Sequence, residues 1–296
     1  MSLSENAKCE ISDLPRVKDR LTFLYLEHCV LTCKASSLCV KSAELQGNVY
    51  VPIATFLVLM IGPGVTISSD AMHLCGDVGV TLLWVGEQGV RLYATGRPLT
   101  VKSKYLDAQV KYYTHQQRRL QVEREMFRSR FPNDDVSTLS HQDLQLREAS
   151  RVKRLYQEYA NMYDISFRRD YDVDNFADGD DVNKALSAGN VCLYGLCHAV
   201  IEALGMSPAL GFVHRSHALS FVYDIGDLYK HEITIPLAFE LGSQHVSDIG
   251  NVVRRRCRDI FAEKKLVKRI VHDLQHLFGF DETEVDVLNV VDLRGE

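Results

Sequence analysis

The chain of 296 residues contains neither a long apolar run nor a cysteine pattern typical of structural zinc. Its longest apolar stretch, residues 56–64 (FLVLMIGPG), is too short to cross a bilayer, so we expect no membrane helix. The first twenty residues are polar and lack the apolar centre of a secretion signal, which predicts a cytoplasmic protein. None of the eight cysteines forms a Cys-x-x-Cys pair, and we therefore expect reduced, mostly buried thiols rather than zinc ligands.

Charge is distributed unevenly along the chain, whose net charge is −5. Residues 281–296 hold six acids and one Arg, which leaves residues 1–280 neutral with 33 basic and 33 acidic side chains. Residues 251–270 carry eight Lys or Arg against two acids. A basic cluster of this kind can bind phosphates even on a chain with negative net charge. We expect the acidic end to be a solvated tail.

The first third of the chain has the pattern of a small β-domain. Between residues 21 and 96, short runs rich in Val, Leu, Thr and Tyr alternate with polar or Gly-containing turns, which is typical of strands. A short helix is expected at residues 69–78, with Ser68 or Ser69 as its cap. These features predict a β-sandwich-like domain over residues 1–97, whose strand edges suit contacts with a partner or a second copy.

Residues 98–280 predict a larger, all-helical domain. The charged and periodic residues 100–131 predict one long helix, and a second helix is expected over residues 141–163. A third helix runs from Asp180 or Asp181 to Gly205 and has the apolar character of a central helix. The fold class is therefore α+β, with a small β-domain followed by a larger helical domain and an acidic tail.

Residues 211–230 (GFVHRSHALSFVYDIGDLYK) hold three possible metal ligands. If residues 219–230 are helical, Asp224 and Asp227 lie on one side of the helix, and His214 arrives from the preceding loop. Two carboxylates held close together repel unless solvent screens them or a cation lies between them. The pattern leaves two interpretations, a solvated helix face or part of a cation site, and the apolar flanking segments favour a cleft.

Two other groups of candidate ligands have simpler interpretations. Glu148 stands among four basic residues of the helix expected at 141–163, and an ion pair with Arg151 explains it. His272 and His276 are four residues apart, but no third ligand has a matching spacing. The histidine pair therefore indicates a solvated helix face.

Six segments resemble a known family and span residues 17–261 in that family's order. They are VKDRLTFLYLE, LLWVGEQGVRLYATG, LREASRVKRLY, DVNKALSAGNVCLYG, GFVHRSHALSFVYDIGDLYK and CRDIF. They resemble the CRISPR-associated integrase of spacer acquisition, the first of the two universal CRISPR adaptation proteins, in its type I-E form. The resemblance implies an N-terminal β-domain, a helical catalytic domain, a homodimer, and a small ferredoxin-like second adaptation protein as partner.

The resemblance also implies a metal site. The family's Glu, His and Asp ligands fall on Glu148, His214 and Asp227, and Asp224 is a fourth catalytic acid that lines the site. Glu148 then becomes a ligand rather than one half of a surface ion pair. Carboxylates with one imidazole suit Mg²⁺ or Mn²⁺. Such an ion polarises a phosphodiester and orients either water, for cleavage, or a DNA 3′-hydroxyl, for strand joining.

Further positions match places where family members contact DNA. They are Arg91, Arg119, Arg169, Tyr171, Tyr194, Tyr223 and Arg254. Three positions depart from the family. His28 replaces an aromatic that wedges a DNA fork, Thr66 replaces an Arg, and His217 replaces a Lys.

The leading hypothesis is a metal-dependent DNA endonuclease and integrase. It inserts captured foreign DNA into a CRISPR array for antiviral defence, and acts on double-stranded, branched or forked DNA and on the repeat. Two alternatives stay open at this point. One is a non-catalytic DNA-binding scaffold of the same complex, and the other is a metal phosphohydrolase that acts on RNA.

Overall fold

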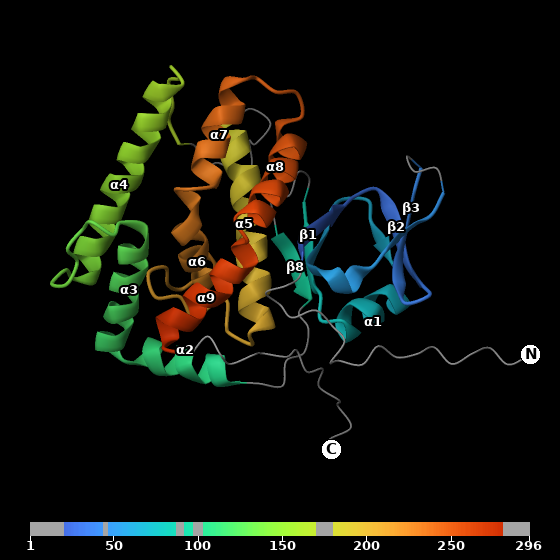
Figure 1. Cartoon of the computed structure of the whole chain (residues 1–296), viewed down its shortest axis with the longest axis horizontal. Coiled ribbons are helices and arrows are strands. Elements are labelled where there is room, and N and C mark those ends of the chain that lie inside the picture. The colour runs from blue at the N-terminus through green and yellow to red at the C-terminus, as the bar shows by residue number, and fades with distance from the viewer. Residues whose placement is uncertain (1–20, 44–46, 87–91, 97–102, 170–179, 281–296) are drawn as a thin grey trace, which may run out of the picture.

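The computed structural model describes residues 21–43, 47–86, 92–96, 103–169 and 180–280. The strands gather on one side of the molecule and the long helices on the other (Figure 1). Two expected DNA contacts, Arg91 and Tyr171, and the acidic tail lie outside the described residues.

Two four-stranded sheets make up most of the described part of the N-terminal region. The first has the order β1 (Leu21–Leu26), β5 (Phe56–Ile61), β7 (Thr81–Val85), β8 (Leu92–Gly96). Its first three strands are parallel, and β8 runs antiparallel to β7. The second has the order β4 (Val49–Val51), β3 (Ser37–Ser42), β2 (Cys29–Lys34), β6 (Thr66–Ile67). Here β2 pairs antiparallel with β3 and parallel with β6.

One apolar core is shared by both sheets and by helix α1 (Ser69–Asp77). Leu31 of β2, Leu59 of β5 and Cys75 of α1 are all fully buried in it. Ser68 caps α1 as predicted, because its Oγ accepts the N–H of Ala71 at 3.2 Å. The predicted β region is confirmed. Its pairing is mixed, however, whereas the sheets of a typical β-sandwich are antiparallel.

Eight helices make up the described part of the C-terminal region. They are α2 (Lys104–Thr114), α3 (Gln116–Arg130), α4 (His141–Met162), α5 (Asp181–Ala203), α6 (Ser220–Lys230), α7 (Thr234–Ser243), α8 (Ile249–Glu263) and α9 (Leu266–Phe278). The helical region is confirmed, as is the helix expected at 141–163, which Ser140 caps in a capping box with Asp143.

The single long helix predicted over residues 100–131 is wrong, because α2 ends and α3 begins at His115. The backbone of His115 is extended, with φ −101° and ψ 113°. Its ring Nδ1 lies 3.1 Å from the carbonyl oxygen of Lys111, the atom that would otherwise accept the His115 N–H in a continuous helix. The apolar period alone did not reveal this local competition.

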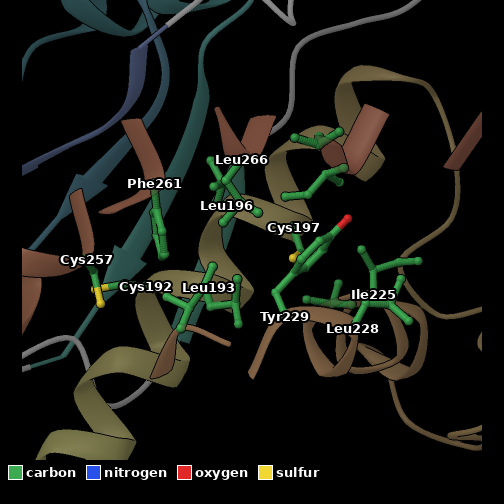
Figure 2. Close-up of a cluster of buried hydrophobic side chains, with 14 of the residues drawn as sticks. Cys192, Leu193, Leu196, Cys197, Ile225, Leu228, Tyr229, Cys257, Phe261 and Leu266 are labelled. Atoms are coloured by element: carbon green, nitrogen blue, oxygen red, sulfur yellow. The ribbon is translucent and has the colours of Figure 1, made fainter. Parts of the chain in front are cut away.

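Helix α5 is the centre of the helical region, as predicted. Cys192 and Leu196 of α5 lie among side chains of α6, α8 and α9, including Ile225, Phe261 and Leu266 (Figure 2). Of the described helices, α5 alone has the length and apolarity to cross a bilayer, and 78% of its apolar window is buried inside the protein. It is the core helix of this fold. The seven described cysteines are free thiols, as predicted, and all but Cys33 are buried.

Close contact between α7 and α5 gives the first testable prediction. A Cβ added at Gly242 would lie 2.9 Å from the backbone nitrogen of Val182 and 2.5 Å from its Cγ2. We expect Gly242→Ala to lower the free energy of unfolding by about 1–3 kcal/mol, because the backbone would have to move. Thermal denaturation measures this change.

Gly76→Ala is the matched control, because its new Cβ on α1 meets nothing within 4 Å. Stability should be unchanged there or raised by up to about 1 kcal/mol, since Ala favours a helix over Gly. Equal melting temperatures for Gly242→Ala and the wild type would contradict the close packing of α7 on α5.

Candidate functional site

A groove of about 890 Å³ lies among helices α3 to α6 and the loop before α6. The three expected metal ligands all line it. Glu148 comes from α4, His214 from the loop, and Asp227 from α6. The structure therefore brings together side chains that are 79 positions apart in the sequence.

Asp224 holds the loop that carries His214. This carboxylate is 3% exposed, and one oxygen accepts the N–H groups of Phe212 (2.5 Å) and Val213 (3.1 Å). The other oxygen accepts the N–H of His214 at 2.8 Å and lies 2.8 Å from the His214 ring Nδ1. These four contacts occupy the hydrogen-bond acceptor positions of the carboxylate, so Asp224 acts as a positioning group for His214.

His214 turns its second ring nitrogen toward Asp227. Nε2 lies 3.8 Å from Asp227 Oδ2, while Nδ1 faces Asp224. The hydrogen bond with Asp224 raises the pKa of His214; burial opposes the shift, and the charges of Asp227 and Glu148 add to it. Because Asp224 engages Nδ1, Nε2 is the nitrogen left to bind a cation.

Glu148 pairs with Arg130 of α3. Arg130 Nη1 lies 2.5 Å from Glu148 Oε1, and both side chains are largely buried. The predicted pair with Arg151 is wrong, because Arg151 binds Asp134 instead. Burial lowers the pKa of Arg130, but the bond to Glu148 and the nearby carboxylates outweigh it, so that the pKa is raised. Arg130 therefore stays charged inside the groove.

Asp227 pairs with Lys230, one helical turn further along α6. Lys230 Nζ lies 2.6 Å from Asp227 Oδ1 and 4.8 Å from the centre of the Tyr194 ring. Burial opposes the charge of Lys230, but Asp227 outweighs it and the pKa of Lys230 is raised. Glu148 and Asp227 therefore each have a cationic partner from the protein itself.

The donor set suits a hard divalent ion, with two carboxylates and one imidazole nitrogen. Within the ranges that the structure describes, however, no three His, Cys, Asp or Glu side chains form a ready-made metal cluster. Instead, Arg130 binds Glu148 and Lys230 binds Asp227. An ion at this site would have to compete with these two cations for the carboxylates.

Three of the expected DNA contacts also line this groove. Tyr194 and Tyr223 have ring centroids 5.0 Å apart in an edge-on arrangement, and Arg169 donates to Asn183 Oδ1 at 2.6 Å. Tyr223 also contacts the ring of His217, at 5.2 Å between centroids. Aromatic faces beside cations are typical of surfaces that bind single-stranded nucleic acid.

The other two described DNA candidates lie elsewhere. Arg119 stacks on Tyr113 of α2, 5.8 Å from its ring centroid. Arg254 lies in a second groove, of about 860 Å³, between β1 and the start of α9. Its guanidinium is buried 4.6 Å from the centroid of the Tyr25 ring. Arg255 and Arg258 line the same groove, together with Asp248 and Asp259. Part of the basic segment 251–270 therefore faces a different groove from Glu148 and Asp227.

Two residues of the main groove were missed from the sequence. Lys230 stands three residues after Asp227, which is the spacing of an ion pair on a helix, so a local signal existed. Arg130 is on a different helix from Glu148 and 18 residues before it, and only the packing of α3 on α4 joins them. No spacing rule predicts that contact.

Comparisons with family models, with curated sequences and with solved structures all match the same family. The family described as CRISPR associated protein Cas1 matches residues 23–171 and 174–275. The chain is 45% identical to a CRISPR-associated endonuclease Cas1 of Clostridium sp. (strain SY8519), over 95% of each sequence. It is 34% identical to that of Escherichia coli (strain K12), over 90% of this chain and 88% of the relative. A solved structure described as a TtCas1–DNA complex has a TM-score of 0.66 and 37% identity, covering 90% of this chain and 99% of that chain.

Proposed function

We propose, because the chain belongs to the Cas1 family of CRISPR-associated proteins, that it is a divalent-metal-dependent DNA endonuclease and integrase. It acts by attack of water or a DNA 3′-hydroxyl on a phosphodiester, and it inserts captured DNA into a CRISPR array. The observation that carries this proposal is the single groove lined by Glu148, His214 and Asp227 beside two tyrosines.

Glu148, Asp227 and His214 Nε2 would hold the metal, which is Mg²⁺ or Mn²⁺ by the nature of these donors. When bound, the ion supplies positive charge that polarises the attacked phosphodiester. Asp224 keeps Nε2 of His214 facing the groove. Arg130 and Lys230 balance the negative charge of the carboxylates in the groove.

Tyr194 and Tyr223 offer ring edges and faces on which an unpaired base at a DNA fork or end can stack. Arg169 binds the backbone nearby, and Arg119 binds the duplex further from the chemistry. Arg254 is a DNA contact by resemblance, although its guanidinium is buried against Tyr25 at the second groove. Arg91 and Tyr171 have the same role by resemblance. The DNA complex of a relative 37% identical to this chain supports a DNA substrate.

The assembly is proposed from the resemblance of the segments between residues 17 and 261. The protein works as a homodimer in the cytoplasm, together with a small ferredoxin-like second adaptation protein of a type I-E system. The β region supplies the strand edges for these contacts.

A half-site integration assay tests the function. Labelled forked DNA and a repeat-containing plasmid are incubated with the protein, with and without its partner, in Mg²⁺, in Mn²⁺ and in EDTA. We expect cleaved and joined products with either metal and none in EDTA, because the carboxylates alone cannot polarise the phosphate.

The alternatives give different results in the same assay. DNA that is bound but never cut with any metal would support the non-catalytic scaffold. Faster hydrolysis of RNA than of DNA would support the phosphohydrolase. Cleavage that persists in EDTA would contradict a metal-dependent mechanism altogether.

A further inference from the structure

We infer that Glu123 is a positioning residue that aligns the two halves of the catalytic groove, the His214 loop and the Glu148 helix. The inference rests on the proposed function for its catalytic meaning. Glu123 lies on α3, outside the groove lining, and none of the sequence motifs pointed to it.

Glu123 is a buried carboxylate, and its two oxygens bind two different elements. Its side chain is 2% exposed. Oε1 accepts Arg215 Nη2 at 2.7 Å, and Oε2 lies 2.7 Å from His141 Nδ1. Burying a carboxylate is costly unless charged or hydrogen-bonding groups compensate it. The two partners provide that compensation, and the carboxylate joins them.

The Arg215 contact fixes the loop that carries His214. Arg215 follows His214 directly, and its Nε donates back to the carbonyl oxygen of Phe212 at 3.2 Å. The loop is therefore held from two sides. Asp224 of α6 takes the backbone N–H groups, and Glu123 of α3 takes the Arg215 side chain. His214 lies between the two anchors, so a shift of either one moves its imidazole.

The His141 contact fixes the helix that carries Glu148. His141 is the first residue of α4, and Glu148 follows it by two helical turns on the same side. Arg124 of α3 also binds this end of α4, through the carbonyl oxygen of Leu139 at 2.8 Å. Among the described residues, Arg124 and Arg130 bond to the α4 side, whereas Glu123 bonds both to the α4 side and to the loop.

The variant Glu123→Gln tests the inference in the full-length chain, because it keeps the shape and removes the charge. We expect Mn²⁺ affinity, measured by titration calorimetry, to fall about 10- to 100-fold, as for other groups that orient metal ligands. The cleavage kcat should fall by a similar factor, with KM for DNA changed less than about threefold.

Hydrogen exchange supplies a readout that needs no metal. Peptides covering residues 211–218 should exchange faster in Glu123→Gln, because loss of the charge weakens the anchor between Glu123 and Arg215. Glu125→Gln is the matched control. Glu125 is on the same helix but pairs with Arg128 at the surface, so exchange and Mn²⁺ affinity should match the wild type.

Arg215→Gln removes the ion pair between Glu123 and the loop but leaves the contact between Glu123 and His141. It is the second test variant if Glu123→Gln does not fold. It should speed exchange in the loop and weaken Mn²⁺ binding in the same way. The positioning role would be overturned if both variants had a lower melting temperature but kept the hydrogen-exchange rate of the loop and the Mn²⁺ affinity of the wild type. A wild-type chain that neither binds Mn²⁺ nor cuts DNA would instead overturn the proposed function, and loop exchange would still decide the role of Glu123.

Discussion

Asp227→Asn should slow metal-dependent cleavage and strand joining about 10²–10³-fold while DNA binding persists. Asp227 is the groove carboxylate that faces His214 Nε2, and the amide keeps its shape but loses its charge. A metal held by one ligand fewer stabilises the developing phosphate charge less. A loss of about 3–4 kcal/mol of transition-state stabilisation corresponds to a rate about 10²–10³-fold lower. Single-turnover cleavage of forked DNA in Mn²⁺ measures this rate.

The variant should fold, because Lys230 keeps its contact with the Tyr194 ring after it loses its anionic partner. DNA affinity should stay equal or rise slightly, since the groove loses one negative charge. Asp77→Asn, an exposed acid at the end of α1, is the control and should cut at the wild-type rate. A near-normal rate in folded Asp227→Asn would remove Asp227 from the metal site.

Local features of the fold were predictable from the sequence, because they depend on neighbours along the chain. The cap at Ser68, the capping box at Ser140 and the buried face of α5 each follow from a few adjacent residues. The break at His115 was not predictable, since a side chain there replaces a backbone hydrogen bond without any Gly or Pro.

The candidate site divides in the same way. The loop and helix of residues 211–230 already placed His214 beside the two aspartates. Glu148 was assigned through resemblance, because nothing local distinguishes it from an acid in a surface ion pair. Arg130 and Glu123 are both on α3, and their roles come only from the packing of α3 on α4 and on the loop. Tertiary contacts of this kind leave no periodic pattern in a sequence.

The groove also explains why two buried cations accompany the acids. Without Arg130 and Lys230, Glu148 and Asp227 would be like charges in a partly buried space, and their repulsion would raise the cost of folding. The two ion pairs compensate the charge of these acids, and a metal ion would have to displace them to bind the carboxylates. Replacement of either cation therefore changes both stability and metal affinity.

Asp224→Asn should be the most destabilising substitution near the groove. The carboxylate accepts three backbone N–H groups from residues 212–214 as well as the His214 ring. An amide offers one oxygen and places an NH₂ group against N–H donors, so at least one buried donor loses its partner. We expect the free energy of unfolding to fall by about 3 kcal/mol or more, since hydrogen bonds to charged groups contribute about 1.5–3 kcal/mol each.

The same variant should shift the pH dependence of metal binding. His214 must be neutral at Nε2 to bind an ion, and the bond to Asp224 is the largest cause of its raised pKa. Wild-type Mn²⁺ affinity should therefore fall as the pH drops through that raised pKa. In Asp224→Asn the pKa of His214 is lower, so the low-pH fall in Mn²⁺ affinity (the acid limb of the pH profile) should move to lower pH. Mn²⁺ affinity at high pH should also fall, because the His214 ring is no longer oriented.

Titration calorimetry with Mn²⁺ over a pH series measures both effects, and Ser220→Ala is the control near the same loop. Ser220 caps the turn at His217 and has no bond to His214, so its substitution should cost stability without moving the acid limb. An acid limb that stays at the wild-type pH in Asp224→Asn would mean that Asp224 does not set the protonation of His214. The carboxylate would then serve the loop backbone alone.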